Sequence, residues 1–96
     1  MWRPRDGRGA EFMGNVAQAK KIHERMGGKV RVSQMLFGGQ PGTVVYVIEH
    51  QDMAAFAKFS DSLNTNTEWQ EFWMSALANP SGDWLQNSLL QEIPGI

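Results

Sequence analysis

Residues 43–50 read Thr-Val-Val-Tyr-Val-Ile-Glu-His, and this stretch decides the fold. Its β-branched and aromatic residues predict a strand. Because it is apolar almost throughout, both of its faces are expected to be buried. One layer of helices can cover only one face of a sheet. The stretch therefore predicts a sheet whose second face is covered by something else, and we expect a second copy of the chain there.

A partner strand is predicted just before this one, over residues 29–37, joined to it by the turn-forming run 38–42. We expect Phe37 to pair with Thr43, which would place Arg31 opposite Glu49. The more apolar face should then meet the helices. The expected helix face is Val30, Val32, Gln34, Leu36, Val44, Tyr46, Ile48 and His50, and the expected partner face is Arg31, Ser33, Met35, Phe37, Thr43, Val45, Val47 and Glu49.

Helical periodicity flanks this hairpin on both sides. Over residues 10–26 apolar side chains recur every three or four positions, and Gly27-Gly28 is expected to end that helix. Asp52 is placed to cap a second helix, and either Thr65 or Asn66 to cap a third. The apolar stripes are Phe12, Val16, Ala19, His23 and Met26, then Met53, Phe56, Ser60 and Leu63, then Trp69, Phe72, Trp73, Ala76 and Leu77.

Two terminal segments complete the predicted sheet, a first strand within residues 1–6 and a last strand over 84–93. The fold class expected is α+β, a single ferredoxin-like domain over residues 1–96. Its order is βαββαβ, with an antiparallel sheet and an extra helix before the last strand.

The length, cysteine content and charge of the chain limit the kinds of partner that it can have. A chain of 96 residues has a small core, and without cysteine it has no disulfides, so oligomerisation is the expected supplement. The net charge of −1 gives no electrostatic footprint for nucleic acid. No apolar run approaches the ~20 residues of a membrane span. The N-terminus lacks the apolar segment of a signal peptide, so we expect a cytoplasmic protein that binds neither nucleic acid nor membrane.

Several segments resemble the dimeric α/β-barrel superfamily, in particular its NIPSNAP-like and antibiotic-biosynthesis-monooxygenase-like branches. The segments are 27–32, 37–43, 47–56, 63–70 and 92–95. Within 63–70, Asn66 and Thr67 stand where the superfamily has an acid and a proline. The resemblance implies a barrel made by two sheets that face each other across a homodimer. Members include cofactor-free monooxygenases, haem-degrading enzymes, polyketide-type cyclases and muconolactone-isomerase-like enzymes, so the fold alone does not choose a reaction.

His23, His50 and Tyr46 are the candidate catalytic residues. The end of the first helix and the end of strand 43–50 should meet at one end of the sheet, which brings the two histidines towards each other with Tyr46 one pleat deeper. Imidazole exchanges protons near neutral pH, so this set could deprotonate a phenolic or 1,3-dicarbonyl carbon. In the alternative, His23 is a semi-buried residue with its hydrogen bonds satisfied, and His50 is a strand-end residue that caps a turn. No metal is expected, because the spacing of metal ligands is missing.

Arg31, Glu49, Trp69 and Trp73 are the candidate ligand-binding residues. The alternative for Arg31 and Glu49 is a cross-strand ion pair, and for the tryptophans a place in the core or a subunit interface. A cleft between helices and sheet holds aromatic or polyketide-like substrates in the superfamily that the chain resembles.

The function expected is a homodimer that binds a small apolar, aromatic or ketone-bearing molecule, with proton transfer or cofactor-free oxygenation as its reaction. No cofactor is expected. The alternative is a non-enzymatic ligand-binding or stress-associated protein on the same scaffold.

Overall fold

A computed structural model describes residues 1–38 and 42–90 of the chain. This part of the chain is α+β, with three helices and a four-stranded antiparallel sheet in the strand order β2-β3-β1-β4. The elements are β1 (Trp2–Pro4), α1 (Gly9–Arg25), β2 (Lys29–Gln34), β3 (Val44–Glu49), α2 (Met53–Leu63), α3 (Thr67–Ala78) and β4 (Gly82–Trp84). The arrangement is compatible with a ferredoxin-like fold.

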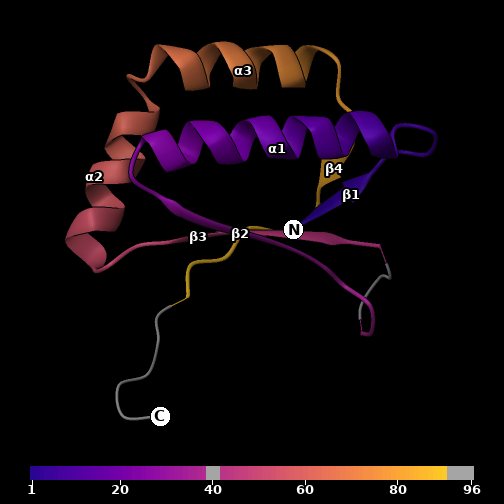
Figure 1. Ribbon diagram of the computed structural model, residues 1–96, viewed down its shortest axis with the longest axis horizontal. Helices are drawn as coiled ribbons and strands as arrows, with labels where there is room; N and C mark the ends of the chain where they lie inside the picture. The colour runs from indigo at the N-terminus through magenta and orange to yellow at the C-terminus, as the bar shows by residue number, and fades with distance from the viewer. Residues whose placement is uncertain (39–41, 91–96) are drawn as a thin grey trace.

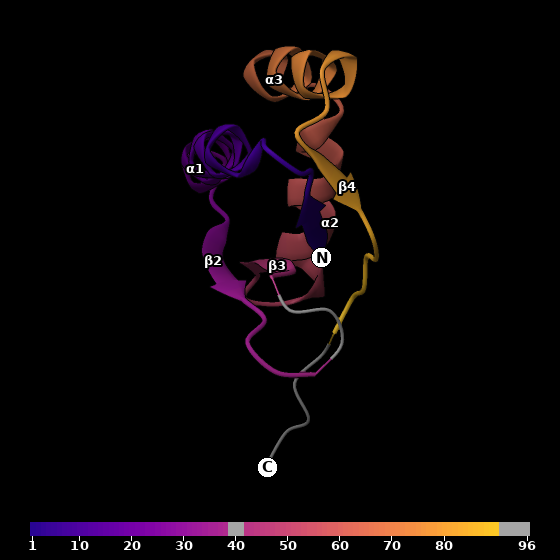
Figure 2. The same cartoon turned by 90° about the vertical axis from the view of Figure 1, so that its right-hand side faces the viewer.

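All three helices lie on one side of the sheet (Figures 1 and 2). The α1 helix crosses the strands, α3 runs beside α1 farther from the sheet, and α2 connects the sheet to α3. Of the described residues outside the strands, 35–38 after β2 and 85–90 after β4 lie on the opposite side (Figure 1). No helix in the described part of the chain is long and apolar enough to cross a membrane. The sheet thus has one covered face, towards the helices, and one open face.

The covered face holds the core. On α1 the buried side chains are Phe12, Ala19, Ile22 and His23. Phe12, Ala19 and His23 belong to the predicted apolar stripe, whereas Ile22 lies next to that stripe and is the most buried of the four. They meet apolar side chains of the strands and of α2. The buried apolar residues among those described are Phe12, Ala19, Ile22, Val30, Val44 and Phe59. The core is therefore small, and it lies between the helices and the centre of the sheet.

Local capping confirms the predicted helix boundaries. Asp52 caps α2, since its Oδ1 atom accepts the Ala55 amide at 2.8 Å. Of the two caps considered for α3 it is Asn66 that acts, accepting the Trp69 amide at 2.8 Å. Gly27 follows the end of α1 with a φ of 94°, a conformation that glycine adopts without strain.

The expected pairing of the β2–β3 hairpin is wrong by two residues. Arg31 lies opposite Val47 rather than Glu49, and Glu49 pairs with Lys29. The ladder closes at Met35, whose amide donates to the Thr43 carbonyl at 2.8 Å, so Phe37 belongs to the connection and not to a strand pair. A shift of two residues keeps the side chains of residues 30–34 and 44–49 on their expected faces, because strand side chains alternate with a period of two. Outside this ladder the expectation is wrong for Leu36, which is 72% exposed instead of facing the helices, and Thr43 is buried.

The last strand is also shorter than predicted. It spans Gly82–Trp84 instead of 84–93 because its partner β1 offers only Trp2–Pro4 for pairing. One further hydrogen bond joins the Leu85 amide to the Met1 carbonyl at 3.0 Å, and residues 86–90 form no strand. The predicted continuation over 91–93 lies outside the described residues.

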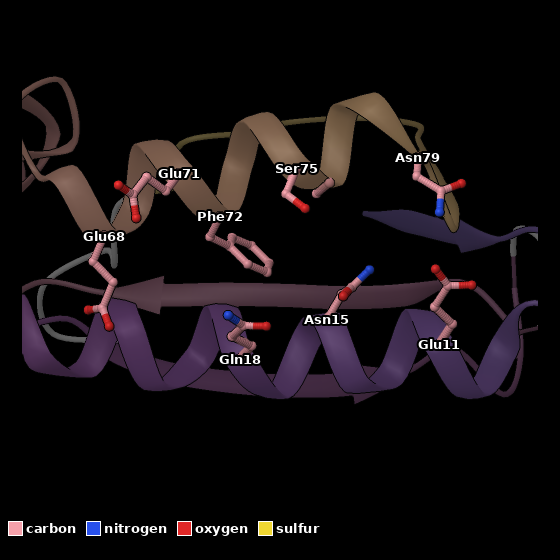
Figure 3. Close-up of a pocket in the computed structure, with 9 residues that line it drawn as sticks. Glu11, Asn15, Gln18, Glu68, Glu71, Phe72, Ser75 and Asn79 are labelled. Atoms are coloured by element: carbon pink, nitrogen blue, oxygen red, sulfur yellow. The ribbon is translucent and has the colours of Figure 1, made fainter.

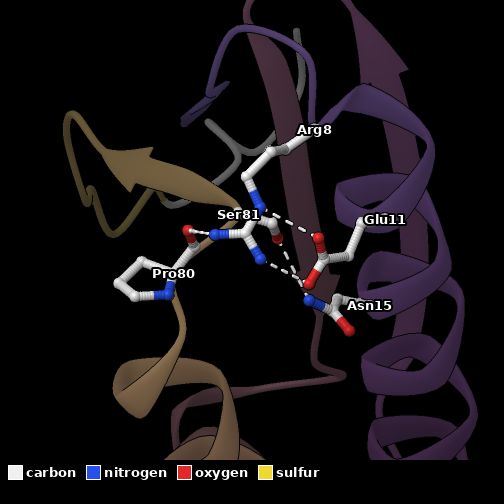
Figure 4. Close-up of polar contacts among 5 residues, drawn as sticks. All are labelled: Arg8, Glu11, Asn15, Pro80 and Ser81. Carbon is white, nitrogen blue, oxygen red and sulfur yellow. Dashed lines mark hydrogen bonds and ion pairs between the residues drawn. The ribbon is translucent and has the colours of Figure 1, made fainter.

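Polar contacts fasten the start of α1 to the connection between α3 and β4 (Figure 4). The Arg8 guanidinium donates to the Pro80 carbonyl at 2.6 Å and to the Glu11 carboxylate at 2.9 Å. The Asn15 amide donates to the Ser81 hydroxyl at 3.1 Å. These bonds fix α3 against α1 at the end of the molecule away from α2.

Candidate ligand site at the end of the sheet

The ends of four elements meet at one end of the sheet. The pair Lys29–Glu49 sets the start of β2 beside the end of β3, and α1 ends and α2 begins close by. A surface pocket of about 460 Å³ opens there, and we call it the sheet-end pocket. Its lining residues are Arg25, Met26, Gly27, His50, Ala55, Lys58, Phe59, Ser62, Asn66 and Glu68.

His50 reaches this pocket directly. It follows β3, is half-buried, and packs its ring against Phe56 and Phe59 with centroid distances of 5.4 and 4.9 Å. Of the three candidate catalytic residues it alone lines the sheet-end pocket.

His23 and Tyr46 are joined to each other behind this pocket. The Nδ1 atom of His23 lies 2.7 Å from the Tyr46 hydroxyl, and the imidazole packs on Trp69 and Phe59 with centroid distances of 4.2 and 5.5 Å. His23 is 4% exposed, although it carries a polar ring. Both histidines therefore contact the Phe59 ring, but only the His23–Tyr46 pair shares a hydrogen bond.

Burial sets the protonation of this pair. It lowers the pKa of the His23 imidazole from 6.5 to about 4, since a charged ring would be desolvated. Burial, reinforced by the nearby Glu24 carboxylate, raises the pKa of the Tyr46 phenol well above its usual value. The Nε2 atom of His23 is buried without a hydrogen-bond partner in the described part of the chain. A neutral imidazole beside a neutral phenol is a weak acid–base pair at neutral pH.

Side chains of β3 and α2 pack closely against the backbone of the turn that joins α1 to β2. A Cβ atom on Gly28 would lie 2.9 Å from the Ile48 side chain and 3.1 Å from the Phe59 ring. No side chain fits there without displacing one of them. Glycine at this position thus lets Phe59 sit against the α1–β2 turn, where it forms the wall between His23 and the sheet-end pocket.

Arg31 and Glu49 lie on the open face of the sheet, away from the helices. The Arg31 Nε atom is 3.2 Å from the Glu49 carboxylate, and the Lys29 ammonium is 3.9 Å from it. The ion pair expected from the sequence thus exists, but it forms diagonally across the ladder. Neither residue lines the sheet-end pocket.

Trp69 and Trp73 belong to an aromatic layer between α3 and the rest of the molecule. Their rings stack on each other with centroids 5.6 Å apart. Trp73 also meets Trp2 and Trp84, at 6.1 and 6.2 Å. Neither tryptophan lines the sheet-end pocket. Both rings pack in the aromatic layer, and Trp69 also contacts the His23 ring.

Most of the residues that line the sheet-end pocket were not predicted from the sequence. Ala55, Lys58, Phe59 and Ser62 line it from α2, at the spacing of one helical face. That spacing is visible in the sequence. These residues lie next to the apolar stripe, however, and the sequence alone does not distinguish a pocket wall from ordinary helix surface. Arg25 and Glu68 come from different helices, and only the fold brings them together. Their side chains form an ion pair at the pocket rim, with Arg25 Nε 3.2 Å from Glu68 Oε1.

A second groove of about 350 Å³ runs between α1 and α3 (Figure 3). Its walls are mostly polar, and three of its residues are the carboxylates Glu11, Glu68 and Glu71. Two of these are paired with arginine, Glu11 with Arg8 and Glu68 with Arg25. Within residues 1–38 and 42–90, no group of three or more acidic or histidine side chains lies close enough together to hold a metal ion.

Comparison with protein-family models, with curated proteins and with solved structures gives no match for this chain. The kinship with the dimeric α/β-barrel superfamily therefore stays a prediction from the sequence.

Proposed function

We propose that this protein is a homodimer of the ferredoxin-like, dimeric α/β-barrel type that binds a small apolar or aromatic molecule in the sheet-end pocket. The observation that carries the proposal is the wall of that pocket, which Met26, Ala55 and Phe59 line together with His50. Pockets of roughly 300–1,000 Å³ with apolar walls and a few polar groups are typical of small-molecule sites. The α1–α3 groove, whose walls are mostly polar, fits such a ligand less well.

Between binding and catalysis, the geometry favours binding. A proton-transferring set needs an accessible base with a pKa near the working pH. His23 is sealed from solvent and its pKa is lowered to about 4, so it serves the fold together with Tyr46. A proton-transfer or cofactor-free oxygenation step would rest on His50. We therefore place the protein among ligand-binding proteins on this scaffold, with His50 as the residue through which any chemistry would act.

The homodimer is supported by the open face of the sheet. Val47 stands on it 41% exposed, and the segments that reach this side carry Leu36, Phe37, Leu89 and Leu90 in exposed positions. The face also carries charges of both signs, since Lys29 and Arg31 form ion pairs with Glu49 there. Apolar residues with charges of both signs suit a second copy related by a twofold axis, because such an interface must be self-complementary.

Filling the pocket tests the binding proposal. Ala55→Leu adds a branched side chain to the pocket wall, whereas Ala57→Leu adds the same group to the exposed side of the same helix. With 2-acetylnaphthalene, a flat aromatic ketone, as the probe in isothermal titration calorimetry, we expect Ala55→Leu to weaken binding about tenfold through steric overlap. Ala57→Leu should leave the affinity unchanged. Equal affinities for the two variants, or no binding by the unmodified protein, would contradict the proposal.

A further inference from the structure

We propose that the sheet-end pocket selects aromatic acids over neutral aromatic molecules, and that Lys58 is the specificity-determining residue that receives the carboxylate. This inference rests on the proposed function, whose binding site it shares, and it adds the charge of the ligand. Among the described residues, three charged side chains line the pocket, the cations Arg25 and Lys58 and the anion Glu68. Two positive charges against one negative leave the rim with a surplus of one positive charge.

Arg25 is not the group that holds this surplus. Its guanidinium makes two parallel contacts with the Glu68 carboxylate, from Nε at 3.2 Å and from Nη2 to the other oxygen. Such a bidentate pair satisfies the planar guanidinium and the carboxylate together. It links the end of α1 to the start of α3 and leaves little charge for a ligand.

Lys58 is the cation left over. It lies on the exposed side of α2, next to Phe59 and three residues after Ala55, both of which line the pocket. The ion pairs formed within the described part of the chain do not include it. Its flexible stem lets the ammonium follow a ligand carboxylate at the pocket mouth.

Two other polar groups of the wall are already engaged. The Ser62 hydroxyl donates to the Phe59 carbonyl at 2.7 Å, and the Asn66 side-chain oxygen caps α3 through the Trp69 amide. The Phe59 and His50 rings are left to contact the aromatic body of the ligand. An aromatic ring against Phe59 and a carboxylate at Lys58 together describe an aromatic acid.

The α1–α3 groove provides the contrast within the same molecule. Its described lining residues include three carboxylates and no cation. Arginines from outside the groove pair with Glu11 and Glu68, which leaves Glu71 as the negative charge that would repel an anionic ligand. Selection for acids is therefore a property of the sheet-end pocket and not of every hollow on this surface.

Two probes of nearly equal shape separate charge from ring stacking. 2-Naphthoate carries a carboxylate where 2-acetylnaphthalene carries a methyl ketone. We expect the unmodified protein to bind 2-naphthoate about three- to fivefold more tightly, which is the size of one exposed ion pair. Lys58→Gln should remove this preference by lowering the affinity for 2-naphthoate to that for 2-acetylnaphthalene. Lys21→Gln makes the same charge change on an exposed face of α1 outside the pocket and should leave the preference intact.

The preference should also shrink in high salt, because exposed charges are screened. Equal affinities of the unmodified protein for both probes would overturn the inference while leaving the proposed function standing. A Lys58→Gln variant that keeps the preference would overturn the role of Lys58. Failure of both probes to bind would instead overturn the proposed function itself.

Discussion

The two faces of the sheet are built from the same two central strands and are covered in opposite ways. On the helix side, Val30 and Val44 are 6% and 4% exposed, and Tyr46 reaches His23 on α1. On the open side, Val47 is 41% exposed and stands among the charged residues Arg31 and Glu49. Apolar residues thus occur on both faces of β3, but only one face has a layer of helices above it.

This difference shows what the strand composition can and cannot settle. Alternation along β2 puts polar residues such as Ser33 on the open face, as a sheet with one solvated side would. The β3 strand breaks this pattern with Val45 and Val47 on the same face. The covered face holds the core of the single chain, whereas for the open face we propose a second copy of the chain. Each of the following experiments tests this difference between the two faces of the sheet.

The largest effect is expected from the covered face. Phe59→Ala removes a ring that packs on both histidines and is 6% exposed, so it should lower the free energy of unfolding by about 3–5 kcal/mol. Met74→Ala shortens a large apolar side chain that is 64% exposed on α3, and it should change that free energy by less than about 0.5 kcal/mol. Urea denaturation followed by tryptophan fluorescence measures both. Similar losses in the two variants would mean that the helix side is not the core.

A smaller effect follows from the pH dependence of His23. Its pKa is lowered to about 4 in the folded protein, while the unfolded chain takes up its proton near 6.5. The neutral ring therefore stabilises the fold above pH 6.5, and this contribution is lost as the pH falls towards 4. We expect it to amount to roughly 2–3 kcal/mol.

His23→Phe isolates this contribution, because it keeps an aromatic ring but removes the titration. Between pH 7 and pH 4 the unmodified protein should lose more stability than the variant, so the difference between their unfolding free energies should change by that amount. Urea denaturation at fixed protein concentration over this pH range is the measurement. Parallel curves for the two proteins would show that His23 is not held neutral by burial.

Helix boundaries and strand faces could be predicted because they depend on nearby residues. The Asp52 and Asn66 caps act on amides three residues away, and Gly27 sets its own backbone conformation. The faces of β2 and β3 followed from alternation alone, which an error of two residues in the pairing does not disturb.

Strand lengths could not be predicted in the same way, since they depend on the partner strand. The run from Trp84 onwards has the composition of a strand, but β1 provides pairing only as far as Trp2 opposite Trp84. The ladder also had to stop at Met35 because Gly42 donates to its carbonyl at 3.2 Å, a detail of the turn that composition does not reveal.

The sequence predicted where the candidate site lies in the fold, but not which residues line it. The expected meeting of helix and strand ends is where the sheet-end pocket lies, and His50 lines it. The sequence could not show that Phe59 would stand between this pocket and His23, because that depends on the close approach at Gly28. Arg25 and Glu68 are 43 residues apart in the chain, so their pairing at the rim follows from packing alone.

The dimer proposed across the open face can be tested by measuring the molar mass of the protein in solution. Size-exclusion chromatography with light scattering should give twice the chain mass of 10.8 kDa for the unmodified protein. Val47→Asp would put a charge that loses its hydration into the interface, opposite Arg31, and should raise the dissociation constant by about tenfold or more because the attraction to the guanidinium does not repay the desolvation, whereas Ala17→Asp, exposed on α1, should not. A mass of 10.8 kDa for the unmodified protein at high concentration, or a Val47→Asp variant that remains a dimer, would contradict the account.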